Sequence, residues 1–224
     1  MSDATTSVPL KGIRGVIARS LTAAWQAPRV AQGLDVDMSA VLARVQAERA
    51  ATGTKISITH AVLRASALTL REHPAVSGIV SDQAVEHWAE VNLGVAVNTP
   101  VGVVVPVLMQ ADTLNLGELE QRVSLLASSA RAGKLTASAY QRGTFTVSTL
   151  GATGIDWFTP VLNPPQIAIL GIGGVAERAV VISGQVVARP MMTLTLVFDH
   201  RALDGHPAGL FLSALAQRLA TVDF

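Results

Sequence analysis

The chain of 224 residues contains no cysteine. Disulfides, thiolate metal sites and thiol nucleophiles are therefore excluded, and any chemistry must come from oxygen and nitrogen groups. Charge is also scarce, because only 15% of the residues are Asp, Glu, Lys or Arg and the formal net charge is +1. No run of Lys and Arg is interleaved with aromatic residues, so we do not expect the chain to bind nucleic acid.

An apolar segment that would cross a membrane is missing as well. The longest uncharged stretch, residues 93–110, contains two prolines, an asparagine and two glycines and is rich in valine, which predicts two strands around a turn. Residues 1–11 carry an acidic residue and no apolar run, so they are expected to form a flexible arm and not a signal peptide. We therefore expect a cytoplasmic protein with no membrane association and no bound metal.

Hydrophobic residues make up half of the chain, which is enough to build one sizeable core. No repeat, linker or low-complexity tract divides the sequence, so we expect one mixed α/β domain over residues 12–224. Apolar periodicity and turn residues predict five helices and a series of strands. The helices are expected from Gly12, after Met38, and over 56–73, 114–135 and 208–220. The strands are expected over 29–38, 78–88 (a hairpin), 93–97, 101–108, 143–151, 166–173, 179–189 (two strands around Ser183-Gly184) and 191–200.

The strongest local signal for chemistry is the segment Phe198-Asp199-His200-Arg201-Ala202-Leu203-Asp204-Gly205, where a continuous apolar strand runs into charged residues. A histidine at the end of a buried strand has a fixed ring, and neighbouring carboxylates and arginine can set its tautomer. His200 is therefore the candidate general base, able to remove a proton from a thiol or hydroxyl. The alternative is a solvated charge cluster at a strand end.

A second candidate is Ser148, at the point where a strand rich in threonine and valine runs into a glycine-containing loop. Its hydroxyl can donate to an oxyanion, although ordinary polarity at a strand end is the more frequent explanation for such a serine. Residues 171–176 formally match a dinucleotide fingerprint with alanine in its last position, but strands and no helix are predicted to follow, which argues against nucleotide binding.

The remaining histidines (His60, His73, His87 and His206) lack the spacing of a zinc site and are expected to be surface or capping residues. Arg14 and Arg19 lie on the first predicted helix. We expect them to be mostly solvated, with the alternative that one of them pairs with a buried carboxylate at the active site.

Four segments in order resemble a known family, the catalytic domain of the acyltransferase (E2) component of 2-oxo acid dehydrogenase complexes. They are GIRGVIARSL, NLGVAVNTPVGVVVPVL, GTFTVSTLGATGIDWFTPVLNPPQIAILGIG and VFDHRALDG. The resemblance covers approximately residues 9–220. It implies a fold like that of chloramphenicol acetyltransferase, in which a mixed β-sheet is flanked by helices, and a homotrimer with active sites between subunits.

The resemblance also implies roles for three residues. His200 matches the catalytic histidine, Asp204 the acidic residue of the His-Arg-x-x-Asp-Gly motif, and Ser148 the serine that stabilises the oxyanion. The implied reaction transfers an acyl group, with acetyl favoured and branched-chain acyl as the alternative, between dihydrolipoamide and coenzyme A. Two other functions stay open: transfer from acyl-CoA to a small alcohol or amine, and a catalytically silent core subunit.

The chain also departs from the family pattern. No segment of these residues resembles a lipoyl domain or a peripheral-subunit-binding domain. We therefore expect either an excised core or a lipoyl group carried on another domain or protein, and 2-oxo acid dehydrogenase components are the expected partners. Arg29 stands where the family usually has histidine. The residues after the last helix are fewer than in members that build cubes or dodecahedra, so we expect a discrete trimer.

Overall fold

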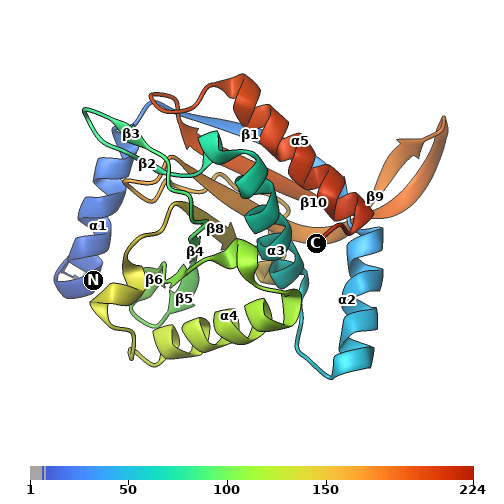
Figure 1. Ribbon diagram of the computed structural model, residues 1–224, viewed down its shortest axis with the longest axis horizontal. Coiled ribbons are helices and arrows are strands. Elements are labelled where there is room, and N and C mark those ends of the chain that lie inside the picture. Colours follow the sequence, from blue (N-terminus) through green and yellow to red (C-terminus); the bar gives the residue numbers. More distant parts are fainter. Residues whose placement is uncertain (1–6, 8) are drawn as a thin grey trace, which may run out of the picture.

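The computed structural model describes residue 7 and residues 9–224. A six-stranded mixed sheet with the strand order β1-β10-β9-β8-β4-β7 forms its centre (Figure 1). Strand β8 pairs in parallel with β4 and with β9, and the other pairings of this sheet are antiparallel. The strands are β1 (Arg29–Asp37), β4 (Leu93–Val95), β7 (Val107–Leu108), β8 (Phe145–Thr149), β9 (Ala168–Ile182) and β10 (Gln185–Asp199).

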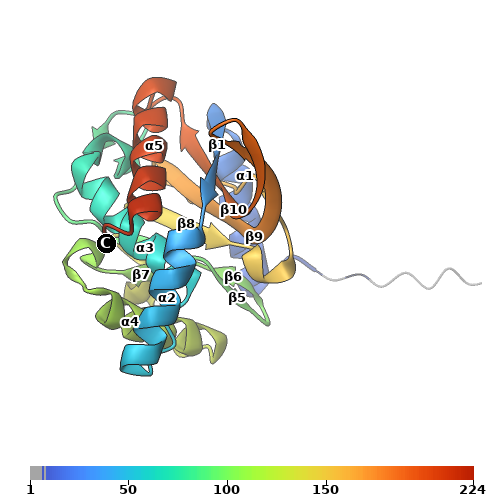
Figure 2. The same ribbon diagram turned by 90° about the vertical axis from the view of Figure 1, so that its right-hand side faces the viewer.

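In the described part of the chain, five α-helices flank the sheet, and they lie close to the predicted positions. They are α1 (Gly12–Trp25), α2 (Ser39–Thr52), α3 (Ile58–Glu72), α4 (Leu116–Arg131) and α5 (Gly205–Thr221), with short 3₁₀ turns at Pro74–Val76, Ala111–Thr113, Ala137–Tyr140 and Gly151–Thr153. Figure 2 shows α1 and α5 on opposite sides of the sheet. Alternate residues of β10 explain this arrangement, because Phe198 packs in the large core with α3 and α5 whereas Val197 packs against Ala24 of α1.

The stretch 93–108 differs from the two continuous strands predicted for it. Each is broken, so that β4 and β7 join the main sheet while β5 (Val97–Thr99) and β6 (Gly102–Val104) form a separate ribbon. Pro106 has no N–H to donate to a ladder, which accounts for one of the breaks. The hairpin predicted around Ser81 and Asp82 is confirmed as β2 (Ile79–Val80) and β3 (Val85–Glu86).

The C-terminal half of the sheet contains longer strands than the sequence indicated. The predicted segments 166–173 and 179–189 belong to β9 and β10, which are 15 residues long each and project as a ribbon beyond the helices (Figure 1). Ser183 and Gly184, both with positive φ, make the tight turn between them. Most of the arm predicted for residues 1–11 lies outside the described residues. In the part of the chain that is described, no helix has the length and apolar character that crossing a membrane requires.

Candidate active site

His200 stands directly after the last residue of β10, at a point that is held firmly by its neighbours. Leu194, Leu196, Val197 and Phe198 are fully buried. The backbone N–H of His200 donates to the carbonyl of Pro28 over 2.9 Å, and its ring lies against Phe198 with the two ring centroids 5.8 Å apart. The His200 side chain is nevertheless 43% exposed. The imidazole of His200 is therefore anchored at the edge of the core and is open to solvent.

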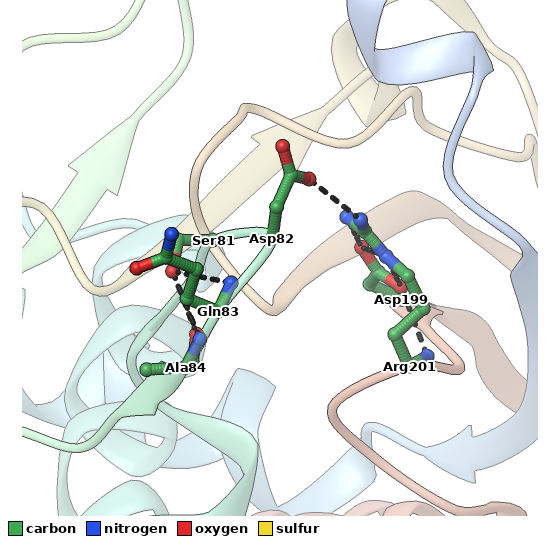
Figure 3. A network of polar contacts seen from close by, with 6 residues as sticks. All are labelled: Ser81, Asp82, Gln83, Ala84, Asp199 and Arg201. Carbon is green, nitrogen blue, oxygen red and sulfur yellow. Dashed lines mark hydrogen bonds and ion pairs between the residues drawn. The ribbon is translucent and has the colours of Figure 1, made fainter.

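The residues on either side of His200 pair with each other and not with its ring. Asp199 is only 2% exposed, and its carboxylate accepts hydrogen bonds from the backbone N–H, Nε and Nη2 of Arg201 at 2.7–3.1 Å. Figure 3 shows that Arg201 also reaches the turn of the β2–β3 hairpin, where its Nη1 lies 3.6 Å from a carboxylate oxygen of Asp82. Hydrogen bonding to Asp199, followed by its attraction, raises the pKa of Arg201. This pairing fixes the backbone that carries His200.

Asp204 is the carboxylate that approaches the imidazole of His200, and it precedes the first turn of α5. The distance from His200 Nδ1 to Asp204 Oδ1 is 3.7 Å, which is too long for a direct hydrogen bond. Asp204 is 83% exposed and caps no N–H of the helix with its side chain. Arg14 and Arg19 are exposed on α1, and among the described residues neither forms an ion pair with Asp204.

Ser148 lies elsewhere, on β8, at the wall of a pocket of about 840 Å³ between the sheet and α1. The pocket is mostly apolar, with side chains that include Val16, Ile17 and Leu21 of α1 and Ile169 of β9. Ser148 is partly buried, so its hydroxyl is accessible from the pocket without being surrounded by water. A hydroxyl in such a place is suited to donate to a developing oxyanion.

Within one chain, His200 and Ser148 are far apart. Ser148 lies opposite Gly171, and Gly171 lies opposite Thr195, which precedes His200 by five residues. The two residues are separated by two interstrand spacings across the sheet and by five residue rises along the strand. These two perpendicular distances together place their Cα atoms about 19 Å apart. The same reacting carbon therefore cannot contact both side chains of a single chain.

The glycines at residues 171–174 lie in the middle of β9, which confirms that they are no dinucleotide turn. A methyl group added at Gly173 would overlap the carbonyl oxygen of Asp156, and the N–H of Gly174 donates to the carbonyl of Ile155 over 2.7 Å. The loop after β8 crosses β9 at this point. The glycines are needed because backbone approaches backbone.

The other histidines take the structural roles that were expected. His60 accepts from the N–H of Ser57 in a capping box at the start of α3, and its burial lowers its pKa. His73 ends that helix, His87 bonds the carbonyl of Ser77, and His206 is exposed on α5. No three His, Asp or Glu side chains of the described chain are grouped to hold a metal ion.

Sequence reasoning missed three polar residues in the wall of the Ser148 pocket, namely Thr146, Asn163 and Gln166. Thr146 precedes Ser148 by two residues, so strand alternation places both side chains on the same face of the sheet. This alternation was the one feature of the sequence from which Thr146 could have been predicted to line the pocket. Asn163 and Gln166 flank a pair of prolines before β9, and only the fold brings them to the pocket.

Two relatives illustrate what this chain is similar to. It is 38% identical over 93% of its length to the dihydrolipoyllysine-residue acetyltransferase component of the acetoin cleaving system of Bacillus subtilis, covering 54% of that protein. It is also 38% identical over 82% of its length to the mitochondrial dihydrolipoyllysine-residue succinyltransferase component of the 2-oxoglutarate dehydrogenase complex of Saccharomyces cerevisiae, covering 40% of it. The chain thus spans about half the length of the curated relatives it matches.

Solved structures agree with this result. The dihydrolipoamide acetyltransferase of Azotobacter vinelandii, studied for the catalytic role of a serine, a histidine and an asparagine, superposes with a TM-score of 0.93 at 33% identity, over 97% of this chain and 92% of that one. The cubic core of a pyruvate dehydrogenase multienzyme complex gives a TM-score of 0.92 at the same identity and coverage. Chloramphenicol acetyltransferase, at 17% identity and a TM-score of 0.56 over 90% of this chain and 94% of that one, shares the fold.

A family model agrees with both kinds of comparison. The model of the 2-oxoacid dehydrogenases acyltransferase catalytic domain matches residues 2–223. The predicted mixed sheet flanked by helices is confirmed, and so is the likeness to chloramphenicol acetyltransferase. The chain therefore belongs to the family of 2-oxoacid dehydrogenase acyltransferase catalytic domains.

Proposed function

We propose that this chain catalyses acyl transfer between a dihydrolipoyl group and coenzyme A, with acetyl as the favoured acyl group and a branched-chain acyl group as the alternative. The names of its relatives support the reaction class, although acetyl and succinyl enzymes match at equal identity. The lipoyl group would be carried by another domain or protein of a 2-oxo acid dehydrogenase complex.

Residue spacing supports the assignment of Ser148, His200 and Asp204. In the Azotobacter vinelandii protein the three residues named for catalysis are a serine, a histidine 52 positions later and an asparagine four positions beyond that. Ser148, His200 and Asp204 have the same spacing in this chain. An acidic residue replaces the asparagine here, and its carboxylate oxygen lies 3.7 Å from Nδ1 of the imidazole.

The mechanism follows from these positions. His200 removes the proton of the attacking thiol, and the thiolate adds to the thioester carbonyl carbon of the other substrate. Ser148 donates a hydrogen bond to the tetrahedral oxyanion, which lowers the barrier by about 3 kcal/mol if it behaves like other such donors. The carbon–sulfur bond of the first thioester then breaks, and the leaving thiolate takes the proton back from His200. No covalent bond to the protein forms.

The observation that carries this proposal is the distance of about 19 Å between the Cα atoms of Ser148 and His200 in one chain, estimated from strand geometry. Two residues that act on one carbon must lie much closer than this. A homotrimer in which Ser148 of one subunit faces His200 of the next would bring them together, in keeping with the trimer that the sequence resemblance implies.

Complementation between two inactive variants tests the proposal. Ser148→Ala and His200→Ala are assayed separately, and then after they have been co-expressed, for transfer from acetyl-CoA to dihydrolipoamide. If sites lie between subunits, random mixing in a trimer gives about a quarter of the sites an intact Ser148 and an intact His200, so about a quarter of wild-type activity returns. Activity no higher than the two parents would contradict an intersubunit site. No turnover by the wild type would contradict the reaction itself.

A further inference from the structure

An arginine with unusual backbone geometry lies in the wall of the Ser148 pocket. Arg142 has a φ angle of 64°, in the left-handed region that favours glycine. It pairs with Glu90, but the two side chains are 58% and 38% exposed, and ion pairs this exposed add little to stability. The pair alone therefore does not account for an arginine at this position, and another use of its side chain has to be sought.

The guanidinium of Arg142 is held in place from two sides. Its Nη2 donates to a carboxylate oxygen of Glu90 over 2.9 Å, and its central carbon lies 5.2 Å from the centroid of the Trp88 ring. The same oxygen of Glu90 accepts from Nδ2 of Asn92, which is fully buried. These hydrogen bonds, first that of Asn92 and then that of Arg142, lower the pKa of Glu90. A chain of contacts thus connects the core with the guanidinium and fixes its position.

Arg142 keeps donors for a further partner. Among the described residues it makes one side-chain hydrogen bond, through Nη2, whereas a guanidinium carries five N–H donors. It is also the one charged residue among those described that line the pocket. A guanidinium that is positioned in advance and still has N–H groups to donate is suited to a carboxylate or a phosphate.

The wall between Arg142 and Ser148 decides which substrate arm fits the pocket. The wall is mostly apolar, and its polar side chains Thr146, Asn163 and Gln166 hydrogen-bond to one another. The arm of CoA carries two amides and a hydroxyl, which would all need partners in such a wall. The arm of a dihydrolipoyl-lysine is hydrocarbon apart from one amide. The pocket therefore favours the lipoyl arm.

The length of the lipoyl arm also matches the pocket. The four residue steps from Thr144 to Ser148 on the β8 side span about 13 Å, and Arg142 precedes this segment by two residues. The arm has about fourteen bonds from the sulfur to the lysine Cα and extends roughly 16 Å. With the reacting sulfur at Ser148, the chain that carries the lysine reaches the end of the pocket formed by Trp88, Tyr140 and Arg142.

We propose that Arg142 binds a carboxylate of the protein that carries the lipoyl group, on a residue next to the lipoylated lysine. Two N–H groups of a guanidinium can meet the two oxygens of a carboxylate in parallel. A charge pair at the rim of an interface acts mainly on the rate of encounter and on the choice of partner. Arg142 is thus a specificity residue for the lipoyl side of the reaction, and the inference rests on the proposed function.

Two peptides test this proposal. Each carries a dihydrolipoyl-lysine, which is flanked on both sides by aspartate in one peptide and by asparagine in the other. In acetyl transfer from acetyl-CoA at low ionic strength, the wild type should have a kcat/KM about fivefold higher for the aspartate peptide. The ratio should approach one in Arg142→Gly, and also for the wild type in about 0.5 M salt. Equal values for the two peptides with the wild type would overturn the proposal.

The choice of variants separates this effect from folding and from net charge. Glycine suits the left-handed backbone at residue 142, so Arg142→Gly should keep the conformation of the loop. Arg122→Gln removes one positive charge from an exposed position on α4 and should keep the preference for the aspartate peptide. If Arg122→Gln lost the preference as well, net charge would be its cause and the proposal would be overturned.

A phosphate of CoA is the competing ligand for Arg142. Acetyl-CoA and acetyl-pantetheine, which has no phosphate, are compared as donors with dihydrolipoamide as the acceptor. The ratio of their kcat/KM values should be the same in the wild type and in Arg142→Gly. A ratio that falls about tenfold in the variant, as expected for a lost hydrogen bond between charged groups, would assign Arg142 to CoA and overturn the proposal.

Calorimetric binding of the two peptides separates the failure of this proposal from the failure of the proposed function. The wild type should bind the aspartate peptide about fivefold more tightly than the asparagine peptide, and Arg142→Gly should bind them equally. If this preference is found but no acetyl group is transferred, the reaction is wrong and the role of Arg142 stands. Equal affinities in the wild type, with acetyl transfer intact, would remove that role and leave the reaction untouched.

Discussion

The two ends of the central sheet differ in how their polar groups are used. At the His200 end, Asp199 and Arg201 satisfy one another, and the cavity beside them measures only about 60 Å³. At the Ser148 end, a pocket of about 840 Å³ is bordered by Ser148 and by the polar side chains of Thr146 and Gln166. One end presents a rigid base without a pocket and the other a pocket without a base, so each is half of the proposed site.

The largest expected effect on activity comes from removing the proposed base, His200. His200→Ala should lower kcat for transfer from acetyl-CoA to dihydrolipoamide by roughly 100- to 10,000-fold, the usual contribution of general-base catalysis. KM should change little, because a general base contributes to the transition state and not to the binding of the substrate. His206→Ala is a matched control on the same surface and should keep its activity. Robust turnover by His200→Ala would assign the proton transfer to another group.

Ser148 should have a smaller effect than His200. Ser148→Ala removes the proposed oxyanion donor and should lower kcat by roughly 100- to 1,000-fold. The apolar walls remain, so CoA affinity measured by calorimetry should stay near the wild-type value. Thr149→Ala, on the opposite face of the same strand, provides a matched control. A large loss of affinity with little loss of kcat would mean that Ser148 binds substrate and does not stabilise the transition state.

The rigidity of the His200 end rests on one ion pair. Arg201→Gln leaves the buried carboxylate of Asp199 without its cation, and we expect the free energy of unfolding to fall by about 2–3 kcal/mol, less than for a fully buried pair because Arg201 is half exposed. Asp199→Asn combined with Arg201→Gln should recover most of this loss, because two amides can pair without charge. Urea unfolding measures both.

The outer contact of Arg201 should matter far less. Asp82 is 99% exposed, and Asp82→Asn should change the free energy of unfolding by about 0.5 kcal/mol or less, as surface ion pairs usually do. Equal destabilisation by Asp82→Asn and Arg201→Gln would show that the hairpin contact, and not the buried carboxylate, holds the turn.

The smallest expected effect involves His60, which lies in the helix layer and in neither half of the site. Burial lowers its folded-state pKa, so the unfolded chain binds a proton more readily than the folded chain. Its contribution to stability is complete above the unfolded pKa of about 6.5 and is lost as the pH falls below that value. His60→Gln keeps a capping acceptor and should make the midpoint of thermal unfolding less dependent on pH between 6.5 and 5. If the midpoint of thermal unfolding changed with pH by the same amount in the wild type and in His60→Gln, His60 would not be the origin of this pH dependence.

Local patterns predicted much of this molecule because they depend on short-range physics. Five amphipathic helices, the hairpin at Ser81 and the strand leading to His200 all follow from periodicity and turn residues, and the structure contains them. The breaks after β4 and β6 and the fusion of predicted strands into β9 and β10 were missed. Strand continuity depends on which partner a strand pairs with, and that information is not local.

The sequence by itself determined the residue types available for chemistry: no thiol, one histidine at the end of a buried strand, and a serine 52 positions before it. Only the tertiary structure decided how they are distributed. It placed Ser148 beside a pocket, paired Thr146 with Gln166 in the wall of that pocket, and separated His200 from Ser148 by the antiparallel course of β10. The physical reason is that distances across a sheet follow from strand order and register, which arise from packing of segments far apart in the chain.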